Sequence, residues 1–434
     1  MAEFAATVYQ NEFLPEGGTD VNAIVTITCA QVGAAGTAGR TGSGDAGEII
    51  IVDTSGSMGR TRMEAAKQAA DAALDQIADG TWFAVVAGTH QAYLACPPVR
   101  SGPGMVVMDA NRRFQAHQAV QQLRADGGTA MGQWLTLAGR LFDSVGGPDG
   151  RGLTKRHAIL LTDGENHNET PDQLSAAIAA VAGRFQCDCR GVGVDWQVAE
   201  VRRIAQALLG TVDIVPEPRA LRAEFAALMQ ASMARGIAAA DLRVWTPQGA
   251  SLLFVRQVSP SVEDLTARRT GVNVLTGAYP TGSWGDESRD YHVAVRLPAK
   301  TLGQEQLAAR VQLAVGPDVV AQSLVKARWS DDEGLTTRIN PEVAHYTGQT
   351  ELADAIQEGL AAKAAGDEAT ATTRLGRAVQ LAAATQNAEA TTRLRKVVDI
   401  DDPETGTVRL RRDVEKADEM ALDTASTKTT RIRS

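Results

Sequence analysis

Residues 48–59, EIIIVDTSGSMG, decide the fold of this chain. Four consecutive apolar residues are typical of a strand that is buried on both faces of a parallel sheet. The strand ends at Asp53, and the following loop presents Ser55 and Ser57 before residues 63–77, which have helical periodicity. Doubly wound sheets bind ligands at the carboxyl ends of their strands. The segment therefore predicts a strand–loop–helix unit with a polar binding loop.

The same alternation of short apolar strands and helices continues to about residue 235. We expect further strands over residues 82–87, 158–161, 189–194 and 212–215. We expect helices over residues 113–123, 131–145, 172–185, 198–209 and 220–233. This pattern is typical of a mostly parallel sheet covered by helices on both faces. Residues 47–236 are therefore predicted to form a doubly wound α/β domain.

The segments that flank this domain have the period of two that is typical of half-buried strands. Apolar and polar residues alternate over 21–29 and again in several runs between about 240 and 330. Turn-like stretches separate these runs, as in an antiparallel β-sandwich. We predict a sandwich over residues 237–335, joined by the strands of residues 1–46, which end in a glycine-rich linker. The α/β domain would then be inserted in, or flanked by, the sandwich.

The C-terminal part of the chain is rich in Ala, Glu and Arg. Three helices are expected, over residues 352–364, 368–384 and 388–397. Their spacing resembles a tetratricopeptide-type hairpin, but so few repeats cannot form a solenoid, which favours a docked helical bundle over residues 336–399. Residues 400–434 are predicted to be a polar tail. A second interpretation is a regulatory tail phosphorylated at Thr429 or Thr430, beside basic residues.

Composition limits the classes of protein to which the chain can belong. Its 434 residues exceed what one hydrophobic core supports, so two or three domains are expected. A net charge of −9 argues against nucleic-acid binding. The sequence shows no signal peptide and no apolar run of membrane-spanning length, so we expect a cytoplasmic protein. Cys187 and Cys189 fall in an expected strand, where buried apolar packing is favoured over a redox or metal role.

Two further polar loops are expected at the same edge of the sheet as the loop after Asp53. Residues 127–130, GGTA, precede an expected helix, and residues 160–164, LLTDG, end an expected strand. Here the sequence resembles the von Willebrand factor A-type domain, over about residues 47–235. Residues 53–57, DTSGS, match its Asp-x-Ser-x-Ser motif, and the other two loops supply its threonine and its second aspartate. The resemblance thus covers the five side chains of the family's metal-ion-dependent adhesion site: Asp53, Ser55, Ser57, Thr129 and Asp163.

The resemblance implies a divalent metal ion as the cofactor. Hydroxyl and carboxylate oxygens suit a hard cation, so Mg²⁺ or Mn²⁺ is expected. In the family the three hydroxyls coordinate the ion directly, and the two carboxylates act mainly through water. Neutral ligands leave the charge of the ion under-compensated, and one position is open to an Asp or Glu of a partner protein. We therefore expect a metal-dependent interaction module or scaffold and not an enzyme.

The partner is less closely defined. The layout resembles bacterial cytoplasmic proteins linked to Ser/Thr kinases, phosphatases or forkhead-associated domains in stress signalling. The alternative is an accessory subunit of a AAA-type ATPase machine that inserts metals or remodels complexes. Neither nucleic acid nor membrane is expected as a partner.

Direct enzymatic functions fit the sequence less well. Asp53 has no second aspartate in its loop, unlike the nucleophile of aspartyl-phosphate enzymes, and Ser57 misses the Gly-x-Ser-x-Gly elbow by one position. No P-loop or His-Glu-x-x-His motif occurs. His167 is the only histidine expected near the site, and both it and Glu165 are interpreted as solvated loop residues.

Overall fold

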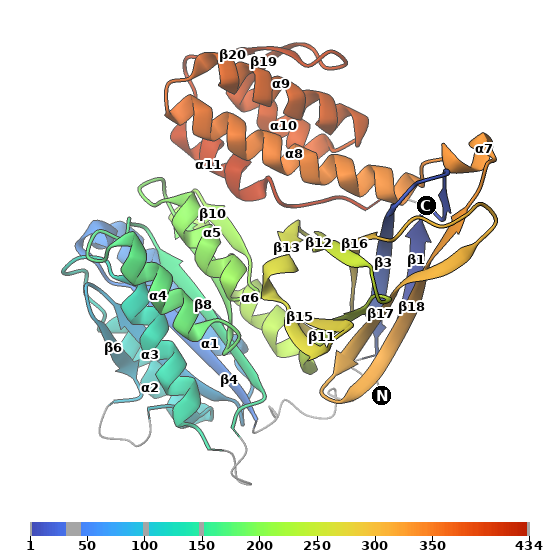
Figure 1. The fold of residues 1–434 in the computed structure, drawn as a ribbon. Coiled ribbons are helices and arrows are strands. Elements are labelled where there is room, and N and C mark those ends of the chain that lie inside the picture. Colours follow the sequence, from blue (N-terminus) through green and yellow to red (C-terminus); the bar gives the residue numbers. More distant parts are fainter. Residues whose placement is uncertain (1, 32–44, 99–103, 147–151, 432–434) are drawn as a thin grey trace. The chain divides into compact units, whose positions relative to one another are not determined.

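A computed structural model describes residues 2–31, 45–98, 104–146 and 152–431. The chain divides into two compact units. One comprises Met1–Gln31, Ala240–Thr281 and Asp286–Ser434, and the other comprises Val32–Ala239 and Gly282–Gly285. The α/β unit therefore interrupts the sequence of the other unit, as an insertion would (Figure 1). Most of the glycine-rich linker, residues 32–44, lies outside the described residues.

The α/β unit is built on a seven-stranded sheet in the order β10-β9-β8-β4-β5-β6, with β7 paired to β5. Its strands are β4 (Ala46–Asp53), β5 (Trp82–Gly88), β6 (Ala92–Cys96), β7 (Val106–Val107), β8 (Lys155–Thr162), β9 (Gln186–Val192) and β10 (Val212–Val215). The five strands from β10 to β5 pair in parallel, whereas β6 and β7 are antiparallel to β5. The central strand β4 is buried along its whole length, as its apolar run predicts. The short antiparallel strands β6 and β7 are not expected from the sequence.

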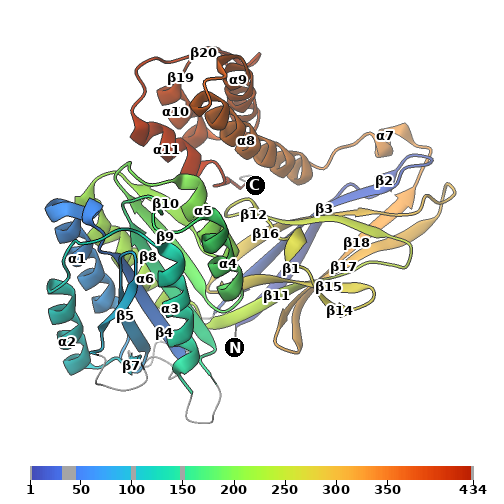
Figure 2. The same cartoon turned by 60° about the vertical axis from the view of Figure 1, so that its left-hand side comes forward.

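Helices cover both faces of this sheet (Figure 2). They are α1 (Gly59–Gln76), α2 (Ala110–Gln121), α3 (Met131–Ser144), α4 (Pro171–Val181), α5 (Val198–Ala207) and α6 (Leu221–Ala234). Ile50 and Val52 of β4 pack in one apolar cluster with residues of α1, α2 and α6. On the other face Trp134 of α3 lies against Gly88, where a Cβ would come within 2.3 Å of its ring. The predicted doubly wound α/β fold is confirmed.

The second unit contains a β-sandwich of two sheets with the orders β1-β3-β16-β12-β13 and β14-β15-β11-β17-β18-β2. The first sheet holds β1 (Glu3–Gln10), β3 (Asp20–Ala30), β12 (Ser251–Ser259), β13 (Glu263–Asp264) and β16 (Glu287–Arg296). The second holds β2 (Phe13–Leu14), β11 (Ile237–Trp245), β14 (Thr270–Asn273), β15 (Thr276–Trp284), β17 (Glu305–Val315) and β18 (Asp318–Trp329). Strand β3 lies between β1 and β16, so the N-terminal strands are part of the sandwich, as the shared period of two suggested.

The C-terminal helical region follows the short helix α7 (Glu333–Thr336). It contains α8 (Pro341–Ala364), α9 (Glu368–Ala384) and α10 (Ala388–Val397), which share one apolar core. Helices α9 and α10 have the expected bounds, but α8 begins at Pro341 and not at residue 352. The side chain of Asn340 caps it by accepting from the backbone N–H groups of Glu342 and Val343, and proline suits the first helical turn.

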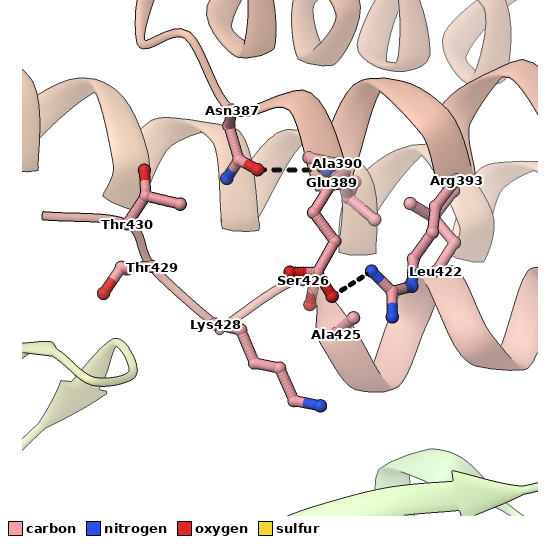
Figure 3. A pocket seen from close by; sticks show the side chains of 11 residues that line it. Asn387, Glu389, Ala390, Arg393, Leu422, Ala425, Ser426, Lys428, Thr429 and Thr430 are labelled. Atoms are coloured by element: carbon pink, nitrogen blue, oxygen red, sulfur yellow. Dashed lines mark hydrogen bonds and ion pairs between the residues drawn. The ribbon is translucent and has the colours of Figure 1, made fainter.

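The expectation of a polar tail from residue 400 is wrong for the described residues up to 431. They form a hairpin of β19 (Val398–Asp402) and β20 (Thr407–Leu410), and then α11 (Lys416–Ala425). Val408 and Leu422 join the apolar core of the helices. Figure 3 shows the segment after α11, where Thr429 and Thr430 line a small pocket beside α10.

Hydrogen bonds tie the final segment to the sandwich and to helix α8. The hydroxyl of Thr429 donates to the backbone oxygen of Val258 at 2.6 Å, and Gln349 donates to the hydroxyl of Thr430 at 2.9 Å. Both threonines are half-buried. The exposed position that favoured phosphorylation is therefore absent, and a kinase would first have to detach the segment.

A buried cluster of charged residues lies near the amino-terminal ends of strands β4, β8 and β9. His157, with 2% of its side chain exposed, lies 2.7 Å from Glu48 Oε2 through Nδ1 and 2.9 Å from Asp188 Oδ2 through Nε2. Ser232 and Thr211 donate to the remaining carboxylate oxygens, each at 2.7 Å. Burial alone would lower the pKa of His157, but the charge of Glu48 and the hydrogen bond to Asp188 raise it overall. The cluster thus favours a protonated histidine between two carboxylates.

We predict that His157→Gln destabilises the protein by about 3–5 kcal/mol, because it removes the cation that lies between two buried carboxylates, of which Glu48 keeps Lys155 at 3.9 Å. The raised pKa means that the contribution of His157 is complete below its ordinary value of 6.5 and is lost as the pH rises through the folded value. The difference between wild type and variant should therefore shrink above neutral pH. Urea unfolding between pH 5.5 and pH 9 measures this. A variant within about 1 kcal/mol of wild type at pH 6 would contradict the prediction.

Candidate metal centre

The three loops singled out in the sequence lie at the carboxyl edge of the α/β sheet. The neighbouring parallel strands β4 and β8 end there, at Asp53 and Thr162. The loop that precedes α3 is tied to the loop after β4 by two backbone hydrogen bonds, Gly56 N to Gly127 O at 2.9 Å and Asp126 N to Thr54 O at 2.8 Å. The parallel pairing and these two bonds therefore bring together segments that are far apart in the sequence.

Asp53 is a fully buried carboxylate at the end of β4. Its Oδ1 accepts from the backbone N–H of Ser55 at 2.8 Å, and its Oδ2 accepts from the hydroxyl of Thr162 at 2.7 Å. Burial raises the pKa of Asp53 to about 6, although the hydrogen bonds from Ser55 and Thr162 oppose the shift. Its donors come from both β4 and β8, so the carboxylate links the two loops that follow these strands.

A chain of hydroxyl and carboxylate oxygens crosses the edge above Asp53. Ser55 Oγ lies 2.9 Å from Ser57 Oγ, and Ser57 Oγ donates to Asp163 Oδ1 at 2.7 Å. Ser55 and Asp163 are buried, whereas Ser57 is exposed to solvent. The chain therefore reaches the surface at its middle member, Ser57, between two buried residues.

The loop after β4, the loop before α3 and the loop after β8 are the first, second and third loops of the site. Thr129 belongs to the second loop and is held by the third. Its backbone N–H donates to Asn168 Oδ1 at 2.9 Å, and its carbonyl accepts from the backbone N–H of Asn168 at 3.0 Å. The side chain of Thr129 is directed toward the same place as that of Ser57. A Cβ on Gly164 would lie 3.0 Å from Ser57 Oγ and 3.4 Å from Thr129 Oγ1.

These residues fit a hard divalent cation. Side chains of the first and third loops are linked by hydrogen bonds that run from Asp53 through Ser55 and Ser57 to Asp163. Thr129 meets Ser57 beside Gly164, whose lack of a side chain keeps the space between the two hydroxyls open. Among the described residues, no group of three or more His, Cys, Asp or Glu side chains could hold a metal ion. The described residues therefore form no site that would bind a metal mainly through nitrogen, sulfur or carboxylate ligands. At the edge beside Gly164 the ligands would be largely hydroxyls, which favour Mg²⁺ or Mn²⁺.

The structure adds residues that sequence reasoning missed. Thr162 donates a hydrogen bond to Asp53. In the sequence, only its position next to Asp163 indicates that it lies near the site. Arg62 of α1 donates to Asp163 Oδ2 at 2.7 Å, which no local pattern indicates. His90, which was not expected near the site, lies beside the second loop, with its Nδ1 2.7 Å from where a Cβ on Gly127 would be.

His167 and the cysteine pair have the properties expected of them, whereas Glu165 is half-buried and accepts from Gln197 Nε2 at 2.6 Å. His167 is 75% exposed, and its Nε2 lies 3.5 Å from Glu165 Oε2. Cys187 and Cys189 are free and buried in β9, and the hydrogen bond with the Cys189 thiol, together with burial, raises the pKa of Cys187. A thiol held in its neutral form is a poor nucleophile and a poor metal ligand.

Comparison with known proteins agrees with this geometry. Residues 48–214 match the model of the von Willebrand factor type A domain, and residues 380–426 match that of the von Willebrand factor type A C-terminal domain. A solved von Willebrand factor type A protein from Catenulispora acidiphila is 46% identical, with a TM-score of 0.91. That alignment covers 99% of this chain and 97% of the other.

More distant relatives are also found. The ArnB paralog VWA2 from Sulfolobus acidocaldarius shares the fold, with 14% identity and a TM-score of 0.58 over 98% of each chain. An uncharacterized protein from Synechocystis sp. is 28% identical over 51% of this chain. This alignment spans only half the length of that curated relative.

The fold, the arrangement of the loops and the full-length similarity together define the class of protein. This chain belongs to the von Willebrand factor type A family. Domains of this family are generally interaction modules without catalytic activity, and they commonly bind a divalent metal. No helix of the described chain is both long enough and apolar enough to span a membrane.

We predict that Gly164→Ala weakens binding of Mn²⁺ by about tenfold or more while all five oxygen-bearing side chains remain. The added methyl group would lie between Ser57 and Thr129, within 3.4 Å of both hydroxyls. Isothermal titration calorimetry measures the affinity, and thermal unfolding in EDTA serves as the folding control. An unchanged affinity in a folded variant would show that the ion is not held beside Gly164.

Proposed function

We propose that the chain is a metal-dependent protein–protein interaction module that binds an acidic side chain of a partner through a divalent ion. The observation that carries this proposal is the arrangement of five oxygen-bearing side chains from three loops at one edge of the sheet. Hydrogen bonds link Asp53, Ser55, Ser57 and Asp163, and Thr129 shares with Ser57 the space beside Gly164. The family supports a role in interaction. The composition of the site, with three neutral hydroxyls and two carboxylates, supports Mg²⁺ or Mn²⁺.

Each of the five residues has a distinct part in this proposal. Ser55, Ser57 and Thr129 would hold the ion through neutral oxygens. Asp53 would stay buried and orient the first loop, and Asp163 would supply charge from the third loop. When bound, the ion supplies a positive charge that attracts an Asp or Glu of the partner. Because the hydroxyls carry no charge, they leave that attraction largely intact.

We infer that surface around the site adds to binding, because contact with a single ion is too small to hold two proteins together. His90, Gln133, Asn168 and Glu169 line a hollow next to the second and third loops. This hollow lies in the α/β unit and could receive residues of the partner next to its acidic side chain.

The identity of the partner is a further proposal, which rests on the layout of the chain alone. We propose a partner in signalling, namely a Ser/Thr kinase, a phosphatase or a forkhead-associated protein linked to stress. The alternative is a AAA-type ATPase that this chain serves as an accessory subunit. Both would meet the chain through an acidic residue, so the binding experiment below can identify either.

The proposed centre should bind about one Mg²⁺ or Mn²⁺ ion per chain, with modest affinity, because Mg²⁺ gives up its water reluctantly. The double variant Asp53→Ala/Asp163→Ala removes both carboxylates and should lose at least about tenfold in affinity. Calorimetry on the full chain measures both proteins. Equal binding by wild type and the double variant would reject the proposed centre.

Partner capture should depend on the metal. Immobilised wild type is expected to retain a specific protein from native cell extract in Mg²⁺ but not in EDTA, and Asp53→Ala should not retain it in either. Replacing one acidic residue of the captured protein should abolish binding, since one carboxylate completes the site. Capture that persists undiminished in excess EDTA would rule out a metal-bridged contact.

A further inference from the structure

Arg62 lies directly against the candidate metal centre, in the first turn of α1. Its Nη1 donates to Asp163 Oδ2, and its Nη2 donates to Asp195 Oδ2, each at 2.7 Å. Asp163 is completely buried, whereas 28% of the Arg62 side chain is exposed. A permanently charged guanidinium therefore pairs with one of the two carboxylates that would serve the metal.

The surroundings hold Arg62 in this place. Asp163 follows β8, and Asp195 lies in the loop between β9 and α5, so carboxylates from two separate loops form ion pairs with the same guanidinium. In the loop between β9 and α5, Gly193 has a φ of +68°. A Cβ there would lie 3.3 Å from the guanidinium carbon of Arg62. The loop passes close to the arginine at a residue without a side chain.

Asp163 consequently has both carboxylate oxygens engaged. Ser57 donates to Oδ1, and Arg62 donates to Oδ2. Of the four charged groups named around the centre, Asp53, Asp163 and Asp195 are negative and Arg62 is positive. Arg62 pairs with Asp163 and Asp195, so part of the negative charge is offset inside the protein. A divalent ion at this centre would be repelled by the guanidinium, since like charges a few ångströms apart interact strongly near a protein surface.

We propose that Arg62 tunes the metal centre, holding its affinity for a divalent ion low until an acidic group of the partner adds negative charge. Metal and partner would then bind cooperatively, because each supplies charge that the other needs. This inference rests on the proposed function, namely that the five oxygen-bearing side chains hold a metal ion.

The test compares binding of Mn²⁺ to the full chain in four forms. Arg62→Gln removes the opposing charge and should bind Mn²⁺ about threefold to tenfold more tightly than wild type. Asp195→Asn leaves the guanidinium charge less compensated and should bind more weakly. Arg60→Gln is the matched control, because Arg60 is an exposed arginine on the same helical turn. Among the described residues, Arg60 forms no ion pair with the carboxylates of the site. The Mn²⁺ affinity of Arg60→Gln should therefore stay within about twofold of wild type.

A second readout isolates the cooperativity. Acetate, the simplest carboxylate probe, should raise the Mn²⁺ affinity of wild type more than that of Arg62→Gln, with chloride at matched ionic strength as the control. Thermal unfolding in EDTA reports whether each variant is folded. Addition of Mn²⁺ should then raise the melting temperature of Arg62→Gln more than that of wild type, because tighter binding to the folded state stabilises it further.

The outcomes separate this inference from the proposed function. If folded Arg62→Gln binds Mn²⁺ no more tightly than wild type, and Asp53→Ala/Asp163→Ala still abolishes binding, the role of Arg62 is overturned but the proposed function is not. Equal tightening by Arg60→Gln also overturns it, because a general charge effect would then suffice. Failure of all forms to bind Mn²⁺ overturns the proposed function itself. Binding by Arg62→Gln when wild type shows none would be the strongest support.

Discussion

The candidate site depends on how one buried carboxylate is satisfied. Asp53 ends the central strand with no exposed surface, and an unpaired charge in such a position would cost several kcal/mol. Its donors are the backbone of its own loop, at Ser55, and the hydroxyl of Thr162 on the neighbouring strand. Satisfying this carboxylate fixes the register of two loops against each other. The hydroxyls of Ser55 and Ser57 are placed as a consequence.

The sequence allowed most of the α/β domain to be predicted from local signals, whereas the set of five candidate ligands came from the resemblance to a family motif. A continuous apolar run identifies β4, and Asp53 directly follows it. The N-terminal strands were also predictable, since β3 alternates with the same period as the strands with which it pairs. The strands needed only patterns within about ten residues, and the rule that parallel strands end at one edge placed Asp53 and the loop after β8 together.

Features that depend on long-range pairing could not be predicted in this way. The hydroxyl of Thr429 is satisfied by the backbone of Val258, 171 residues away in sequence. A threonine-rich segment resembles a solvated tail until such acceptors are known. Arg431 is similar, because it forms two hydrogen bonds with Asp290, a residue that is 2% exposed and that also accepts from Tyr346 of α8. One buried carboxylate of the sandwich thus anchors both the beginning of the helical region and the end of the described chain.

The two polar clusters of the α/β sheet show why ionisable groups alone do not define a site. His157 sits between two carboxylates that also receive donors from Ser232 and Thr211. That cluster is sealed from solvent, and its two carboxylates face His157 and Lys155 within the protein, so it has nothing to offer a ligand. At the opposite edge, hydroxyls lie beside Gly164 and reach the surface at Ser57. There the hydroxyls of Ser55 and Ser57 bond to one another and to Asp163. An ion can replace these hydrogen bonds, because a hydroxyl oxygen can coordinate a cation while its proton turns elsewhere. Exposure and exchangeable partners, more than the number of charges, therefore distinguish the binding edge from the structural one.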